Sequence, residues 1–253
     1  MNRTNNVFHY LSWPVQNVVA FTTTVHHPEQ FKRSSSYGNF NLGLHVGDDK
    51  SILQSNRNLL LNYLPEKTSI QWLEQVHGNN VEVITTCSGV LIADASITQQ
   101  KNIALAVMTA DCLPIIISSL DGSEIAVIHG GWKPLSQNII EQTLLKMNTA
   151  VQDLHVWLGP CIGPASFEVG KEVYEQFISI DSDFKKAFVA FKSSENEIKY
   201  LANLHLIAQV QLEKLGAQYV YSLPHCTFTQ TDDYYSYRRS HKTGRMATMI
   251  CRT

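Results

Sequence analysis

The fold is decided by the stretch 103–133, which reads IALAVMTADCLPIIISSLDGSEIAVIHGGWK. It holds three short apolar runs, Ile103–Met108, Leu113–Ile117 and Ile125–Ile128, all rich in β-branched residues. Continuous apolar runs of this length are typical of strands that are buried on both faces. The stretch therefore predicts buried strands placed one after another along the chain.

Further runs outside this stretch extend the prediction to an α/β protein. Strands are expected at Val18–Val25, Val81–Ile84, Val156–Leu158 and Tyr219–Leu223. One helix opens at Pro134 and a second is stopped by Gly216. Their apolar faces comprise Leu135, Ile139, Ile140, Leu144 and Met147 in the first, and Leu204, Ile207, Ala208, Leu212 and Leu215 in the second. Strands and helices do not alternate strictly, which favours a sandwich with mixed sheets over a doubly wound fold.

Composition indicates one intracellular domain. The chain has 253 residues, of which 44% are hydrophobic and 17% charged, and no repeat or low-complexity linker divides it. We therefore expect one domain over residues 1–253, with a loop at 26–41. A net charge of −2 gives no reason to expect nucleic-acid binding, and no apolar run is long enough to cross a membrane. No signal-like segment opens the chain, and its odd number of cysteines fits reduced thiols, so a cytoplasmic location is expected.

Three potential metal ligands stand at the ends of predicted strands. His77, Cys112 and His129 each lie where a turn can present a side chain to a shared cleft. Two imidazoles and a thiolate form a partial shell for zinc, and three protein ligands leave the fourth position open for water or substrate, as in catalytic sites. The gaps are too wide for a zinc finger. A lone histidine or buried cysteine is often only structural.

Five sequence motifs support the metal hypothesis. The chain contains QVHG at 75–78, TADCLPI at 109–115, AVIHGGWK at 126–133, LGPCIGPASFEVG at 158–170 and YSYRRSHKTGRMA at 235–247. In this order they resemble the YfiH family, also called the laccase-domain or polyphenol oxidoreductase family, from about Val18 to the C-terminus. The resemblance implies that His77, Cys112 and His129 are zinc ligands and that the layers run α, β, β, α. It also implies purine nucleoside phosphorylase activity, with adenosine deamination and methylthioadenosine phosphorolysis.

Cationic residues near these motifs are candidates for binding phosphate. Gly130 and Gly131 allow close backbone approach to a ligand, and a helix beginning near Pro134 would direct free N–H groups to an anion neutralised by Lys133. The family usually has Arg at this position; Lys133 keeps the charge but lacks the bidentate donor fork, so phosphate affinity is the property expected to differ. Arg238 is the first choice for a substrate phosphate contact and Arg245 the second, on what we expect to be a hairpin, although either could be a structural ion-pair partner.

Two further positions carry expectations of their own. Asp111, beside Cys112, could orient a ligand histidine or accept a proton, or it could simply cap a turn. Asn203 stands where the family usually has Asp, and as an N-cap it serves the following helix nearly as well.

The favoured hypothesis is therefore a zinc enzyme that binds purine nucleosides and phosphate. Phosphate near Lys133 and Arg238 would attack C1′ of the nucleoside, and zinc, which lowers the pKa of its water to about 7, would support deamination at C6. One alternative is a cysteine hydrolase or amidase using Cys112, acting on a peptidoglycan precursor as proposed within the family. A second is a copper-dependent polyphenol oxidase, since copper can bind the same ligands as zinc. A structural zinc would need Cys161 or His225 as fourth ligand.

Overall fold

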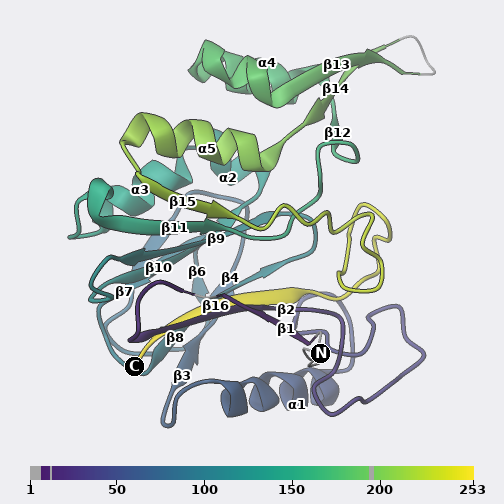
Figure 1. Ribbon diagram of the computed structural model, residues 1–253. Coiled ribbons are helices and arrows are strands. Elements are labelled where there is room, and N and C mark those ends of the chain that lie inside the picture. Colours follow the sequence, from purple (N-terminus) through teal and green to yellow (C-terminus); the bar gives the residue numbers. More distant parts are fainter. Residues whose placement is uncertain (1–6, 12, 194–196) are drawn as a thin grey trace, which may run out of the picture.

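Two mixed β-sheets face each other in the middle of the protein (Figure 1). The computed structural model describes residues 7–11, 13–193 and 197–253. Sheet I has the order β1 (Phe8–Tyr10), β2 (Val18–Thr23), β16 (Met246–Arg252), β8 (Ile103–Thr109) and β3 (Ser69–Gln71). Its strands pair antiparallel, except that β3 runs parallel to β8. The last described strand of the chain is therefore central in this sheet.

Sheet II contains the strands that lead to the predicted metal ligands. Its order is β15 (Tyr219–Ser222), β11 (Leu154–Leu158), β9 (Leu113–Ser119), β10 (Ile125–Gly130), β7 (Ala95–Thr98) and β5 (Val81–Val83). The pairs β11–β15 and β5–β7 are parallel, whereas β9 pairs antiparallel with both β10 and β11. A further short parallel pair joins β4 (Leu73–Glu74) to β6 (Leu91–Ile92).

The sandwich follows from the two-residue period of buried strands. In β8, Leu105 and Val107 belong to the hydrophobic core between the sheets, whereas Ala104 and Ala106 belong to the core on the outer side of sheet I. Successive side chains of a strand point to opposite faces, so an entirely apolar strand needs a packing partner on each side. Strands β9 and β10 divide their residues in the same way between the inner core and the helices.

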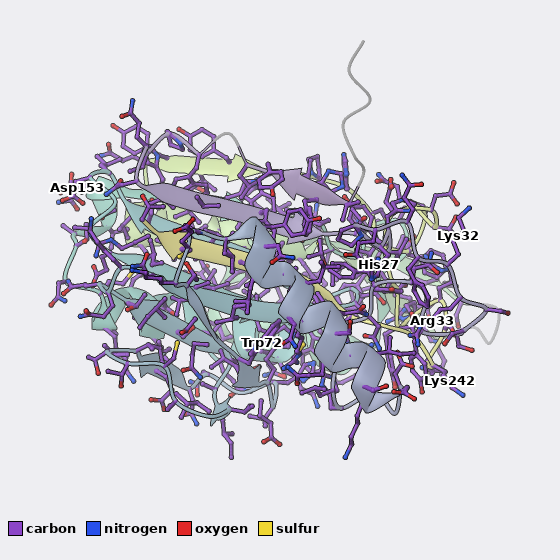
Figure 2. All side chains as sticks on the ribbon, turned by 90° about the horizontal axis from the view of Figure 1, so that it is seen from below. His27, Lys32, Arg33, Trp72, Asp153 and Lys242 are labelled. Atoms are coloured by element: carbon purple, nitrogen blue, oxygen red, sulfur yellow. The ribbon has the colours of Figure 1, made fainter. Side chains whose placement is uncertain are left out.

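Helices supply the outer partners. Helix α1 (Lys50–Leu60), followed by η1 (Leu61–Tyr63), covers sheet I, and Figure 2 looks onto this face with Trp72 beside the helix. Sheet II is covered by α2 (Trp132–Ser136), α3 (Ile139–Lys146) and α5 (Leu204–Leu215). Beyond them lie α4 (Lys171–Ile180), η3 (Ser182–Ala187) and the strands β12 (Glu168–Val169), β14 (Ile198–Ala202) and β13 (Phe188–Lys192). The 3-10 helix η2 (Val151–Asp153) precedes β11. The predicted α-β-β-α layering is confirmed.

The strands predicted from apolar runs are all present, within a few residues of the expected bounds. The helix predicted to stop at Gly216 is α5, whose C-cap Gly216 has φ 89°. Asn203 caps its N-terminus, because the side chain accepts a hydrogen bond from the backbone N–H of Leu206 at 3.1 Å. Local periodicity and capping therefore identified these elements correctly.

Two local predictions were wrong. The helix expected from Pro134 begins at Trp132 and is broken after Ser136, because Asn138 adopts a left-handed conformation (φ 58°) through which no α-helix continues. The expected C-terminal hairpin is absent within the described residues. Residues 235–245 form turns, and Met246 opens the long central strand β16, whose apolar residues fill both faces of sheet I.

The segment His26–Asn41, expected as a mobile loop, has no regular secondary structure but is tied to the rest of the protein. Arg33 forms an ion pair with Asp48 and donates a hydrogen bond to the carbonyl of Gly38 at 2.6 Å. Phe40 is fully buried. The chain that follows it toward α1 passes close to the predicted site. Among the described residues, no helix combines the length and apolar character needed to span a membrane.

Candidate metal centre and active site

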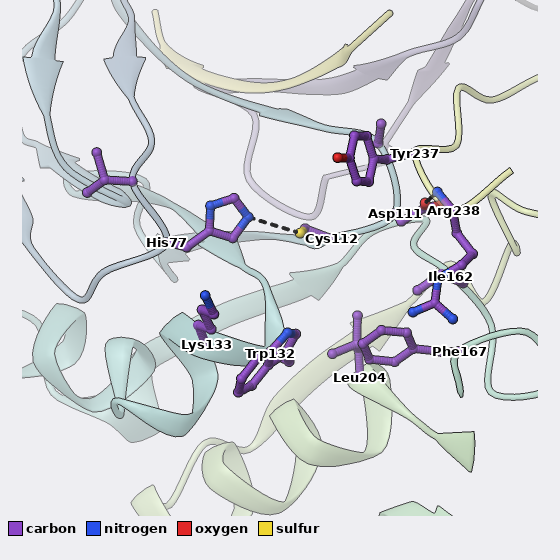
Figure 3. A pocket seen from close by; sticks show the side chains of 12 residues that line it. His77, Asp111, Cys112, Trp132, Lys133, Ile162, Phe167, Leu204, Tyr237 and Arg238 are labelled. Atoms are coloured by element: carbon purple, nitrogen blue, oxygen red, sulfur yellow. Dashed lines mark hydrogen bonds between the residues drawn. The ribbon is translucent and has the colours of Figure 1, made fainter. Parts of the chain in front are cut away.

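The predicted ligands His77, Cys112 and His129 come together at one end of sheet II. Cys112 immediately precedes β9, and His129 lies near the end of β10, directly opposite Pro114 in the β9–β10 pair. His77 lies in the turn between β4 and β5, where its φ of 59° is left-handed. The three ligand atoms lie within 4.8 Å of one another, and Figure 3 shows the 3.9 Å contact between Cys112 Sγ and His77 Nε2. We call these residues the His–Cys–His group.

The donor set and spacing fit a tetrahedral metal ion. With Zn–S near 2.3 Å and Zn–N near 2.0 Å, tetrahedral geometry places a sulfur and a nitrogen ligand about 3.6 Å apart. The Cys112–His77 distance of 3.9 Å is close to this value. His129 is buried, Cys112 is half-buried and His77 is exposed, so the group has one open side. An open side suits a site where substrate reaches the metal.

A buried carboxylate that the sequence prediction missed holds the group together. Asp94, at the start of β7, has no exposed surface. Its Oδ1 accepts hydrogen bonds from Nδ1 of His129 at 2.7 Å and from the backbone N–H of His77 at 3.0 Å. Its Oδ2 accepts from the backbone N–H groups of Gly78 at 2.7 Å and Val76 at 3.2 Å. One side chain thus contacts both histidine positions.

These bonds determine how the two histidines are presented. Because a carboxylate only accepts, Nδ1 of His129 must carry a hydrogen, so Nε2 is the nitrogen that would bind a metal once it has lost its own proton. The three backbone bonds stabilise the left-handed turn that carries His77. A charged residue in the apolar segment Ala93-Asp94-Ala95 was the available signal, but a single sequence does not say which partner it has.

The electrostatics of the group favour a thiolate beside an imidazolium. Burial alone would raise the pKa of Cys112, but the charges and hydrogen bonds of His129 and His77 outweigh it and lower the pKa to about 6. Burial likewise opposes protonation of His129, yet the Cys112 thiolate and Asp94 raise its pKa to about 9. The thiolate is the form of cysteine that binds metals and acts as a nucleophile.

Of the roles considered for Asp111, its contacts match the capping of a turn. Its carboxylate accepts hydrogen bonds from the hydroxyls of Thr227 at 2.6 Å and Ser236 at 3.0 Å, and from the backbone N–H of Arg238 at 2.7 Å. The residue has φ 93°, an unusual value outside glycine. Asp111 therefore caps the turn around residue 236, and the carboxylate bound to a ligand histidine is Asp94.

A cavity of about 350 Å³ opens on one side of the His–Cys–His group (Figure 3). We call it the Trp132 cavity. Its walls are mainly apolar and aromatic, and the charged groups at its margin are Lys133, Asp111 and Arg238. The residues that line it are Val76, His77, Ala110, Asp111, Cys112, Trp132, Lys133, Ile162, Phe167, Leu204, Tyr237 and Arg238. Cavities of this volume are typical of small-molecule sites.

A second cavity of about 390 Å³, which we call the Arg245 cavity, opens beside the same group. It shares His77, Ala110, Cys112 and Tyr237 with the Trp132 cavity and adds His129. Its remaining lining residues are His45, Gln75, Met108, Thr109 and Arg245. The His–Cys–His group therefore contacts both cavities.

The predicted cations are distributed between the two cavities. Lys133 and Arg238, both exposed, line the Trp132 cavity, and the Arg238 guanidinium donates to the carbonyl of Glu168 at 2.9 Å. Arg245 lines the other cavity. Arg239 instead binds the backbone carbonyls of Thr227 and Tyr234. Lys133 also lies in a helix of only five residues, shorter than expected for an anion site at a helix N-terminus.

The suggested fourth ligands for a structural zinc lie outside the group. The described residues contain a single candidate group with histidine, cysteine or carboxylate ligands, and it has three members. Cys161 instead contacts Nδ1 of His205 at 3.4 Å, and Nδ1 of His225 lies 2.9 Å from the Tyr234 hydroxyl. Neither side chain completes a closed four-ligand site.

Comparison with known proteins identifies the family. The family model described as multi-copper polyphenol oxidoreductase laccase matches residues 21–253. The chain belongs to this family. Its members include proteins named YfiH, which confirms the resemblance inferred from the five sequence phrases.

Relatives in the family carry enzyme names. A purine nucleoside phosphorylase of Haemophilus influenzae is 39% identical, over 94% of this chain and 96% of the relative. The purine nucleoside phosphorylase YfiH of Escherichia coli is 38% identical, over 85% of this chain and 86% of the relative. An enzyme of this general kind is therefore supported.

A solved structure agrees closely with the fold. The Neisseria meningitidis protein NMB0706 superposes with a TM-score of 0.90 at 32% identity, covering 97% of this chain and 99% of that protein. YlmD of Geobacillus stearothermophilus superposes with a TM-score of 0.82 at 25% identity, covering 97% and 98%. The layered fold is thus shared along nearly the whole chain.

Proposed function

We propose that the protein is a zinc-dependent purine nucleoside phosphorylase acting on adenosine, inosine and methylthioadenosine, with adenosine deamination as a side activity. The observation that carries this proposal is the His–Cys–His group, which contacts two cavities large enough for two reactants. The phosphorylase names of the relatives point to the same reaction. The proposal requires a purine nucleoside and phosphate to meet beside this group.

Zinc would be held by His77, Cys112 and His129, with Asp94 orienting His129. When bound, zinc supplies positive charge that polarises a substrate oxygen and activates water. The Cys112 thiolate neutralises part of that charge. The backbone bonds of Asp94 keep His77 at the exposed margin of the site, where a substrate approaches. Copper could occupy the same ligands, because imidazole and thiolate also bind copper.

The Trp132 cavity suits the nucleoside. Trp132 and Phe167 offer aromatic surfaces and Leu204 an aliphatic one, and a purine ring gains free energy by leaving water against such walls (Figure 3). In phosphorolysis, an oxygen of phosphate forms a bond to C1′ while the bond from C1′ to N9 breaks. The purine leaves with that electron pair and takes up a proton. Lys133, Arg238 and Arg245 are the candidates for holding the phosphate charge.

The test incubates zinc-loaded protein with adenosine or inosine, with and without inorganic phosphate, and separates the products by chromatography. Phosphate-dependent release of adenine or hypoxanthine is expected. Cys112→Ala should abolish it, whereas Cys87→Ala, which changes an exposed cysteine outside both cavities, should not. The absence of free base and of inosine from adenosine, in protein shown to contain zinc, would contradict the proposal.

A cysteine hydrolase is the second candidate. The lowered pKa of Cys112 and its contact with His77 provide a thiolate and a neighbouring imidazole, the pair that such an enzyme needs. The two candidates respond differently to chelation. A zinc-dependent phosphorylase loses activity when the metal is removed, whereas a thiol amidase acting on a peptidoglycan precursor gains a free nucleophile.

A further inference from the structure

The Arg245 cavity has an unusual charge balance. Its lining residues include a guanidinium and three imidazoles but no carboxylate. The anionic group it shares with the Trp132 cavity is the Cys112 thiolate, which a bound metal would neutralise. The Trp132 cavity, by contrast, contains Asp111 among its lining residues. The two cavities therefore differ in the charge of ligand that they can accept.

Arg245 is held in place mainly through backbone contacts. Its backbone N–H donates to Asn41 Oδ1 at 2.8 Å, and its guanidinium donates to the carbonyls of Thr243 at 3.2 Å and Gly244 at 2.9 Å. Gly43 packs so closely that an added Cβ would lie 2.8 Å from Cγ of Arg245. Within the described part of the chain, no carboxylate lies within ion-pair distance of this arginine.

A second cation, which is buried, lies behind the same cavity. Arg57 is only 7% exposed, stacks 3.8 Å above the ring of Trp72, and donates to the carbonyl of Leu42 at 2.8 Å. It also contacts Sδ of Met108, which lines the cavity, at 3.3 Å. Burial lowers the pKa of Arg57 to about 10, so it remains cationic at neutral pH. In the described residues its charge has no carboxylate partner, and a buried charge of this kind acts over a longer range than a surface one.

His45 completes the lining on the side of the β2–α1 loop. Burial together with the charges of Arg245 and Arg57 lowers the pKa of His45. At neutral pH the ring is therefore uncharged and presents one N–H donor. A tetrahedral anion could accept from that N–H and from the Arg245 guanidinium beside the His–Cys–His group. The cations of the Trp132 cavity are less suited, because Lys133 and Arg238 share that cavity with the Asp111 carboxylate, whereas no carboxylate lines the Arg245 cavity.

We propose that the Arg245 cavity is an oxyanion-binding site, in which Arg245 and His45 hold inorganic phosphate beside the shared group, next to the nucleoside in the adjoining Trp132 cavity. The identification of this anion as the co-substrate rests on the proposed phosphorylase function, whereas anion binding itself does not. Lys133 and Arg238 then contact the nucleoside side of the reaction. This assignment reverses the order expected from sequence, in which Arg238 came before Arg245.

The test measures inorganic phosphate binding by isothermal titration calorimetry with zinc-loaded protein, repeated with metal-free protein. Arg245→Gln should weaken phosphate binding roughly tenfold or more in both forms, because a guanidinium–phosphate contact is charge-assisted. The matched variants Arg238→Gln and Lys133→Gln, which remove a charge from the Trp132 cavity, should change the affinity for phosphate less than threefold. His45→Ala changes an exposed loop residue and should also weaken phosphate binding. It replaces Arg245→Gln as the test if that variant does not fold.

Several outcomes would overturn the proposal. Phosphate binding that survives Arg245→Gln and His45→Ala but is lost in Arg238→Gln would place the anion in the Trp132 cavity. Binding of adenosine 5′-monophosphate without binding of free phosphate would also contradict a separate oxyanion site. Phosphate binding lost in Arg245→Gln, in a protein that cleaves no nucleoside, would refute the phosphorylase function and leave the oxyanion site standing.

Discussion

Asp94→Asn is the most informative single change, because this carboxylate accepts four hydrogen bonds, two of them from His77 and His129. Asparagine has nearly the same shape but one acceptor oxygen instead of two. Whichever way its amide is turned, the NH₂ group faces two N–H donors that lose their partner. We expect the variant to fold with a disturbed His77 turn and a less strongly oriented His129.

The magnitude follows from those bonds. A hydrogen bond to a charged group contributes about 1.5–3 kcal/mol, so losing two costs the metal-free protein about 3 kcal/mol or more. The free energy of unfolding of an ordinary domain is about 5–15 kcal/mol. The variant therefore loses a large part of its stability but should still fold. Loss of the carboxylate that orients a ligand histidine typically weakens metal binding about 10–100-fold. Zinc affinity of Asp94→Asn should fall within that range.

The assay is competition for zinc against a chromophoric chelator, accompanied by urea unfolding of the metal-free protein. Asp121→Asn is the matched control, because Asp121 also accepts hydrogen bonds in a turn but lies exposed between β9 and β10. The control should keep wild-type zinc affinity. A zinc affinity of Asp94→Asn within about twofold of wild type would refute the argument that this carboxylate organises the site.

Three further predictions concern charge, substrate and backbone. Folding lowers the pKa of Cys112 to about 6 and raises that of His129 to about 9, so as pH rises from 6.5 to 9 the stabilisation from Cys112 grows while that from His129 falls. These two changes offset in wild type, whereas Cys112→Ser keeps only the His129 contribution and should lose stability as pH rises through this range; urea unfolding of both proteins across pH measures it, and parallel curves would contradict the pair. Phe167→Ala should raise KM for the nucleoside more than KM for phosphate in steady-state kinetics, and an equal rise would argue against its place beside the purine. Gly216→Ala should cost about 1 kcal/mol in urea unfolding, because φ 89° is strained for alanine; unchanged stability would contradict this.

The sandwich could be predicted because its buried strands are apolar on both faces. Leu105 and Val107 point to one core and Ala104 and Ala106 to another, and such a strand reads as a continuous apolar run. Strand β16 was missed because its start at Met246 directly follows the polar turn that suggested a hairpin. Its pairing between β2 and β8 depends on contacts far apart in sequence, which local patterns do not encode.

The candidate ligands could be found from sequence because each ends an apolar run or follows one, and because the surrounding phrases resemble the family. The residues that support the site could not be found from sequence. Asp94 reaches His129 through strand pairing between β7 and β10, and His45 comes to line a cavity with Arg245 through a loop without regular secondary structure. Sequence could not decide between the roles considered for Asp111, because its partners Thr227 and Ser236 lie more than a hundred residues away.

The central claim is that the His–Cys–His group supports phosphate-dependent cleavage of a purine nucleoside. Phosphorus NMR of zinc-loaded protein with inosine and inorganic phosphate tests it most directly, because phosphorolysis and hydrolysis give different sugar products. The account predicts a ribose 1-phosphate signal that grows in step with hypoxanthine and disappears in Cys112→Ala or after zinc removal. Hypoxanthine released without a sugar phosphate, or a sugar phosphate formed equally well by Cys112→Ala, would contradict it.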